Sequence, residues 1–213
     1  MFEENRKGRP PGRASAQRRG IERRRAIVDA AEALLTEGGY EAATLKAISA
    51  RVGIPITSVY HYFSDRHQVE IELLTRHVRA LDEIVAGSLD DPGVRTLGQA
   101  VDAVADPVLE YLRRHRSCAE LWFRGRDERI EDVVGAFDRA QAERLRGVLV
   151  ERGLLAADTS PRVLEFALEA ANRLFDLAFR ASPTGDDATL DEARRLVTAY
   201  LGTYAGPEAT GRG

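Results

Sequence analysis

Several features common in secreted and membrane proteins are missing from this chain. A single cysteine, Cys118, rules out an internal disulfide. No apolar run approaches the roughly 18 residues that would span a bilayer, and no hydrophobic segment follows the charged N-terminus MFEENRKGRPPGR. We therefore expect a cytoplasmic protein with no membrane partner.

Patterns typical of metal sites and of catalysis are also missing. The spacing of the histidines, at positions 61, 67, 77 and 115, does not match that of metal ligands. No nucleophile, general base and orienting group recur at a recognisable spacing. The sequence predicts no metal, no cofactor and no enzymatic activity.

The small net charge of −3 hides an asymmetry along the chain. Residues 1–79 hold 14 Lys and Arg against 10 Asp and Glu, whereas the remainder holds 17 against 24. Within the basic part, residues 1–25 alone carry nine cations and three glutamates. A concentration of positive charge attracts phosphate and releases its counterions, so the first part of the chain is a candidate for nucleic-acid binding. A solvated basic tail without a partner is the alternative interpretation.

Alternating strand-like patterns are absent, and helical periodicity runs through most of the sequence. Capping residues and glycine stops divide this periodicity into separate segments. The sequence therefore predicts an all-α protein of about nine helices. We expect them in residues 23–38, 44–52, 55–63, 64–85, 96–115, 117–124, 127–152, 161–180 and 186–204.

The stretch GIPITSVYHYF, residues 53–63, joins two short amphipathic helices through a glycine turn. That arrangement is typical of a helix-turn-helix, whose second helix enters the major groove of DNA. Helical spacing turns Ile56, Val59, Tyr60 and Phe63 toward the hydrophobic support. The same spacing turns four other side chains outward, where they can reach base edges or phosphates: Thr57, Ser58, His61 and Tyr62.

The segment TLKAISARVGIPITSVYHYFSDRHQVEIEL, preceded by RRRAIVDAAEALLTEGGYEAAT, resembles the N-terminal domain of the TetR family of transcriptional repressors. The resemblance covers about residues 22–75. It rests on Thr44, Ile48, Gly53, Tyr60, His61 and Phe63. Ser49 stands where the family commonly has alanine, Ala43 where a second threonine is frequent, and Ile56 where a polar or basic residue is common.

The resemblance implies how this domain meets DNA. It places Thr44 and Lys46 on phosphates near the second helix, the third helix in the groove with Tyr60 on a phosphate, and Arg66 on the backbone at the start of the fourth helix. Together with the outward-facing residues of the third helix, the DNA-binding residues expected here are Thr44, Lys46, Pro55, Thr57, Ser58, Tyr60, His61, Tyr62 and Arg66.

Ahead of this domain, Gly8-Arg9-Pro10 is similar to the core of an AT-hook, in which an extended arginine lies in a narrow minor groove. We therefore interpret residues 1–20 as a basic extended arm with Arg9 as a DNA contact. A tail without a function remains the alternative.

The resemblance also implies that the later helices form a ligand-binding and dimerisation domain, with the last two helices pairing in a homodimer. Independently, residues 161–180 carry apolar side chains on two faces, as a helix shared between a core and an interface requires. Aromatic residues with a few polar neighbours could line a pocket for a small-molecule effector. The candidates are Tyr111, His115, Trp122, Phe123, Phe137, Asn172 and Phe175.

Together these features predict a basic arm (1–20), a helix-turn-helix DNA-binding domain (21–66), a ligand-binding and dimerisation domain (67–206) and a disordered tail (207–213). The function expected is that of a ligand-responsive regulator, a repressor that binds a palindromic double-stranded operator as a homodimer and is released by a small molecule. A non-specific architectural DNA-binding protein is the first alternative. An enzyme with an appended DNA-binding domain is the second.

Overall fold

The computed structural model of the protein describes residues 13–124 and 128–206. Within these residues it contains nine α-helices, one 3-10 helix and no strand, with one isolated antiparallel bridge between Leu155 and Ala205. The expected all-α class is confirmed. The elements are α1 (Arg13–Gly38), η1 (Tyr40–Ala42), α2 (Leu45–Val52), α3 (Ile56–Tyr62), α4 (Arg66–Ser88), α5 (Leu97–Arg114), α6 (Arg116–Arg124), α7 (Glu128–Glu151), α8 (Pro161–Ala181) and α9 (Asp187–Gly202).

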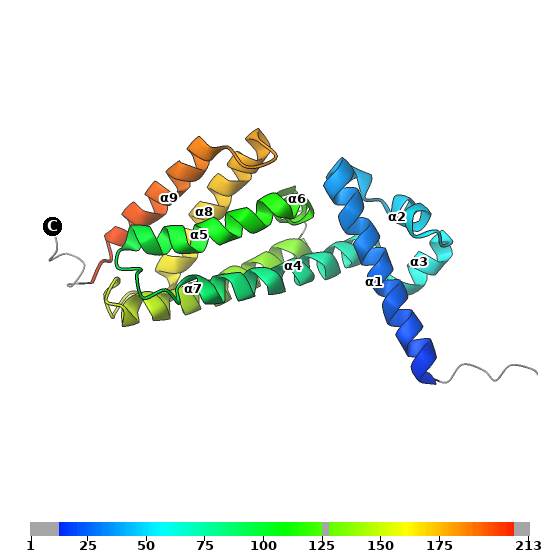
Figure 1. Ribbon diagram of the computed structural model, residues 1–213, viewed down its shortest axis with the longest axis horizontal. Helices are drawn as coiled ribbons and strands as arrows, with labels where there is room; N and C mark the ends of the chain where they lie inside the picture. Colours follow the sequence, from blue (N-terminus) through cyan, green and yellow to red (C-terminus); the bar gives the residue numbers. More distant parts are fainter. Residues whose placement is uncertain (1–12, 125–127, 207–213) are drawn as a thin grey trace, which may run out of the picture.

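Two lobes share the long helix α4 (Figure 1). The smaller lobe holds α1, α2 and α3, and α1 packs against both α4 and α6. In the larger lobe α8 contacts α7 and α9, while α5 contacts α4 and α9. Any displacement of α4 would therefore move side chains that pack in both lobes.

The hydrophobic core continues from one lobe into the other. One buried cluster begins in the smaller lobe with Ile27, Ile48 and Val59 and reaches Trp122 in α6 and Phe175 in α8. A second cluster fills the far end of the larger lobe. Because packed interiors transmit strain, the continuous cluster couples the two lobes mechanically.

The first helix is longer than expected. It begins at Arg13, so residues 13–20 are helical rather than part of an extended arm. Alanine, glutamine and arginine favour helix in this segment, and Arg18 pairs with Glu22 one turn later at 3.1 Å. Residues 1–12, including Arg9, lie outside the described residues, as does the tail from residue 207.

Local caps set most of the other helix boundaries. Ser160 caps α8 and Pro161 occupies its first position. Helix α4, expected from residue 64, begins at Arg66 with Asp65 as its cap, because the Asp65 carboxylate accepts the Gln68 N–H at 2.9 Å. Both caps satisfy amide groups that have no partner inside the helix.

Candidate nucleic-acid interface and interior cavity

The turn between α2 and α3 is fixed by backbone geometry and by one hydroxyl. Gly53 has φ 72°, a left-handed conformation that glycine adopts without steric cost. The Ser49 hydroxyl donates to the Ile54 carbonyl at 2.6 Å. Serine at this position, a departure from the family pattern, therefore closes the turn from inside α2.

Helix α3 is anchored on one side and exposed on the other. Val59 and Phe63 are fully buried, whereas Thr57 and His61 are exposed and lie one turn apart. The orientation expected from the sequence is thus found for these two residues. Ser58 and Tyr62 are half-buried, and Tyr60 is 54% exposed although its ring was expected to pack.

The start of α2 presents further polar groups beside this surface. The Thr44 hydroxyl oxygen accepts the Ala47 N–H at 3.1 Å, which caps α2, and Thr44 remains exposed. Lys46 is also exposed and forms no ion pair within the described residues. Pro55, exposed as well, caps α3. Helix caps and unpaired ammonium groups are both able to hold a phosphate.

Arg66 faces the inside of the junction between the lobes. Its guanidinium pairs with Glu70 and donates to the Tyr40 carbonyl, both at 2.5 Å, and it lies over the Tyr40 ring. The contacts with Tyr40 hold the start of α4 against η1, which follows α1. A phosphate contact by Arg66 would have to compete with them, a point that the residue type alone does not reveal.

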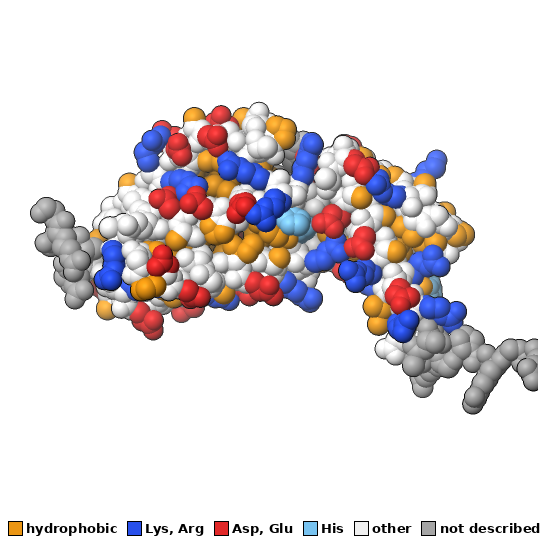
Figure 2. Space-filling view, in the orientation of Figure 1, with side chains coloured by type: hydrophobic (Ala, Val, Ile, Leu, Met, Phe, Trp, Pro, Cys, Tyr) orange, Lys and Arg blue, Asp and Glu red, His pale blue; other side chains and the backbone are white. Residues whose placement is uncertain are grey.

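Basic side chains also follow the N-terminal half of α1. Arg19 and Arg23 border a shallow depression together with Tyr62 of α3. Figure 2 shows Lys and Arg side chains gathered around this part of the smaller lobe. The positive charge therefore adjoins α3, and Arg19 belongs to the segment that the sequence had assigned to an extended arm.

The larger lobe encloses an apolar cavity of about 140 Å³. Helices α4 to α9 all contribute to its wall. Five of the seven residues expected to bind a ligand line it: Trp122, Phe123, Phe137, Asn172 and Phe175. Their clustering could be expected from the resemblance but not from helical periodicity, because they come from three different helices.

Two polar atoms of the cavity wall have no hydrogen-bond partner among the described residues. These are the Trp122 indole N–H and the Gln141 side-chain carbonyl, both buried. The Gln141 amide nitrogen donates to the Asp82 carboxylate at 2.8 Å, which fixes which end of the amide is the oxygen. An unpaired donor and an unpaired acceptor in an apolar cavity each cost about 1–3 kcal/mol. Sequence reasoning missed Gln141, since nothing marks it within α7.

The remaining polar wall residues are paired. Asn172 donates to the Asp138 carboxylate at 2.8 Å. Arg194 of α9 bridges Asp102 and Asp106 of α5 at 2.8 and 2.6 Å. The two charged residues of the wall, Asp138 and Arg194, are thus both engaged by other protein groups.

Tyr111 and His115 do not line the cavity. They lie instead near the junction of the lobes, where their rings stack at 4.2 Å and the Tyr111 hydroxyl lies 2.8 Å from Nδ1 of His77. Burial, with help from the nearby His115 and Arg76, lowers the pKa of His77 to about 4. His77 is therefore neutral near pH 7.

No helix within the described residues is long and apolar enough to cross a bilayer.

Two family profiles cover most of the chain. The profile described as "Bacterial regulatory proteins, tetR family" matches residues 27–71, and "Tetracyclin repressor-like, C-terminal domain" matches residues 96–201. The gap between the two, residues 72–95, covers most of α4 and the loop that follows it.

Comparison with individual proteins gives the same picture. The crystal structure of a TetR-family transcriptional regulator from Streptomyces coelicolor is 33% identical, with 85% of this chain and 99% of that chain covered and a TM-score of 0.60. A second similar structure is that of SmeT, the repressor of the Stenotrophomonas maltophilia multidrug efflux pump SmeDEF. It is 21% identical, with 87% of this chain and 92% of that chain covered, and its TM-score of 0.64 shows a similar fold.

The curated relatives matched first align over only part of the chain. The transcriptional repressor KstR of Rhodococcus jostii is 34% identical over 61 residues, which are 29% of this chain and 29% of KstR. The chain thus spans less than a third of the length of these relatives.

Proposed function

Because the chain belongs to the TetR family of bacterial regulatory proteins, we propose that it is a transcriptional regulator whose α3 reads a DNA operator and whose interior cavity receives a small molecule. The observation that carries the proposal is the orientation of α3. Its apolar residues Val59 and Phe63 are sealed in the core, while Thr57 and His61 are presented to solvent. Hydroxyl and imidazole groups on a firmly anchored helix can read base edges.

The DNA-binding form is a homodimer that pairs through α8 and α9. Phe166 and Leu177 of α8 are 57% and 42% exposed, and Leu196 of α9 is 44% exposed. Phe166 and Leu177 lie about three turns apart, so they share one face of α8. Large apolar side chains left exposed on neighbouring helices favour an interface, and a two-fold axis would present two α3 helices to a palindromic operator.

The effector is a mainly apolar molecule with one polar group that both accepts and donates a hydrogen bond. Such a group supplies both the acceptor that the Trp122 indole N–H lacks and the donor that the Gln141 carbonyl lacks. The volume of about 140 Å³ holds a ring about the size of benzene without rearrangement. A larger effector would have to push the wall helices apart.

Helix α4 connects the two sites. Leu81 and Val85 in its second half line the cavity, whereas Val69 and Leu73 in its first half are buried in the cluster that supports the smaller lobe. An effector releases DNA only if it binds the form that cannot bind DNA more tightly than the form that can. Displacement of α4 by a filled cavity would supply this difference.

A selection experiment distinguishes a regulator from an architectural protein. Purified protein is used to select sequences from random duplex DNA at fixed salt, and the selected sequence is compared with bulk DNA. A palindromic sequence bound roughly a thousandfold more tightly than bulk DNA is expected. Equal affinity for all sequences would favour the architectural alternative.

The effector class is tested by thermal denaturation with small cyclic alcohols and their matched hydrocarbons. The alcohols should raise the melting temperature more, because only they satisfy both unpaired atoms. In Gln141→Leu this difference should shrink, since the acceptor is gone. Equal shifts for alcohol and hydrocarbon in the native protein would contradict the proposed polar contact.

A further inference from the structure

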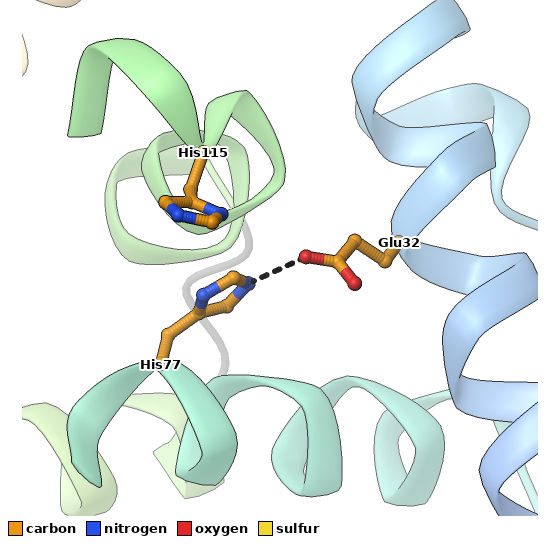
Figure 3. A group of neighbouring side chains, drawn as sticks. All are labelled: Glu32, His77 and His115. Atoms are coloured by element: carbon orange, nitrogen blue, oxygen red, sulfur yellow. Dashed lines mark ion pairs between the residues drawn. The ribbon is translucent and has the colours of Figure 1, made fainter. Parts of the chain in front are cut away.

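Three potential metal ligands meet at the junction between the lobes. Glu32 comes from α1, His77 from α4, and His115 from the short link between α5 and α6. One ligand atom from each lies within 4.8 Å of the others, and Nε2 of His77 is 3.8 Å from Oε1 of Glu32 (Figure 3). We propose that Glu32, His77 and His115 bind a divalent transition-metal ion of the zinc class, which pins the DNA-binding lobe to the larger lobe.

Neighbouring side chains hold each ligand in place. Nδ1 of His77 is engaged by the Tyr111 hydroxyl at 2.8 Å, which leaves Nε2 facing Glu32. Metal-binding histidines commonly engage their second nitrogen in this way. Ser117, whose hydroxyl lies 3.2 Å from Nε2, would rotate away when a metal takes that lone pair.

The other two ligands are oriented as well. Oε2 of Glu32 is held by Arg76 at 2.5 Å, so Oε1 is the oxygen that faces the imidazole. His115 is stacked on the Tyr111 ring. Arg76 opposes a bound cation, but its charge is shared with Asp29 at 2.6 Å.

The ligand chemistry selects the class of metal. Two imidazole nitrogens and one carboxylate oxygen suit zinc and its neighbours, whereas calcium and magnesium prefer oxygen ligands throughout. Three protein ligands leave a fourth tetrahedral position for water or another small ligand.

Binding would also tighten the junction. Zinc bonds of about 2.0–2.2 Å place tetrahedral ligand atoms roughly 3.3–3.5 Å apart. The present spread of up to 4.8 Å is wider, so the metal must draw the ligands together. Because Glu32 belongs to α1 and both histidines lie outside the smaller lobe, this movement changes how that lobe sits on α4. DNA affinity should consequently depend on the metal.

The test uses full-length protein stripped of metal with a chelator and then titrated with Zn²⁺ in competition with a chromogenic chelator. One Zn²⁺ per chain is expected. His115→Ala and Glu32→Gln should each weaken binding at least about tenfold, and Tyr111→Phe, which only releases Nδ1 of His77, by about tenfold. His67→Ala, which removes another histidine of α4, is the matched control and should bind Zn²⁺ as the native protein does.

A second measurement guards against misfolded variants and against surface binding. Circular dichroism melting establishes that each variant is folded before titration, and Co²⁺ in place of Zn²⁺ gives an absorption spectrum that reports four-coordinate binding. Folded His115→Ala or Glu32→Gln that binds Zn²⁺ with native affinity would overturn the proposal. So would a native protein that binds no Zn²⁺ at about 100 μM. Neither result depends on the protein having an operator.

Discussion

At the scale of single residues, the orientation of α3 decides which side chains can meet a DNA groove. Thr57 and His61 share the exposed side, one turn apart, while Val59 is buried beneath them. Side chains that read bases and side chains that hold phosphates should respond differently to substitution. Base contacts carry sequence information, whereas phosphate contacts do not.

Thr57→Ala and His61→Ala should each cost about 1–3 kcal/mol of binding free energy at particular base pairs of the operator. Lys46→Ala should weaken binding evenly across sequences. It should also reduce the slope of log affinity against log salt by about one, which corresponds to the loss of one phosphate contact. Affinities measured on single-base operator variants at several salt concentrations separate the two patterns. A uniform loss for Thr57→Ala and His61→Ala would mean that neither residue reads a base.

At the scale of helices, two adjacent residues at the start of α4, Ser64 and Asp65, both have side chains that can cap a helix, and Asp65 does so. The Asp65 carboxylate accepts the Gln68 N–H, whereas the Ser64 hydroxyl contacts only the side chain of Asp65. Asp65 therefore stabilises the helix that both lobes share.

Asp65→Ala should lower the free energy of unfolding by about 1 kcal/mol, and Ser64→Ala by a few tenths. The Gln68 amide, more than the Ser64 hydroxyl, lowers the pKa of Asp65 below its ordinary value of 3.8. The contribution of a carboxylate with a lowered pKa is present above the pKa of the unfolded chain and is lost as the pH falls through the pKa of the folded protein. Urea unfolding at pH 7 and near pH 3 should thus show a smaller difference between native protein and Asp65→Ala at the lower pH.

The N-terminal arm is a separate prediction at this scale. Removal of residues 1–12 leaves α1 whole but deletes Arg6, Lys7 and Arg9. If these cations hold phosphates or enter the minor groove, deletion should weaken operator binding and reduce the slope of log affinity against log salt by up to about three. An unchanged slope would assign these residues to a tail without a DNA contact.

At the scale of the whole molecule, the continuous hydrophobic cluster and α4 link the DNA-binding lobe to the cavity. The same architecture leaves apolar side chains uncovered on α8 and α9. Leu196 of α9 and Tyr204, just beyond this helix, are 44% and 36% exposed, while Val197 and Leu201 pack inside. Exposure on this face is what the proposed dimer requires.

Phe166→Glu combined with Leu177→Glu should convert the dimer into a monomer, since two charges at the centre of a two-fold interface face their own copies. Sedimentation at micromolar concentration measures the change. Ile21→Glu, which charges an equally exposed apolar residue in the other lobe, should leave the dimer intact. Native protein that sediments as a monomer would rule out the proposed assembly.

The sequence by itself determined the helices and the helix-turn-helix, because caps, glycine stops and apolar periodicity act within a few neighbouring residues. It determined the exposed side of α3 for the same reason, since Thr57 and His61 are fixed by the burial of Val59 and Phe63. It placed the starts of α1 and α4 less well, where helix formers and adjacent capping residues compete.

Only the tertiary structure decided which distant residues meet. Glu32, His77 and His115 are far apart in the sequence, so no spacing rule could place them within 4.8 Å of one another. Packing likewise separated Tyr111 from the cavity and left the Gln141 carbonyl without a partner among the residues that the structure describes. These outcomes depend on how whole helices pack against each other, and that packing follows from the shape of all the buried side chains together.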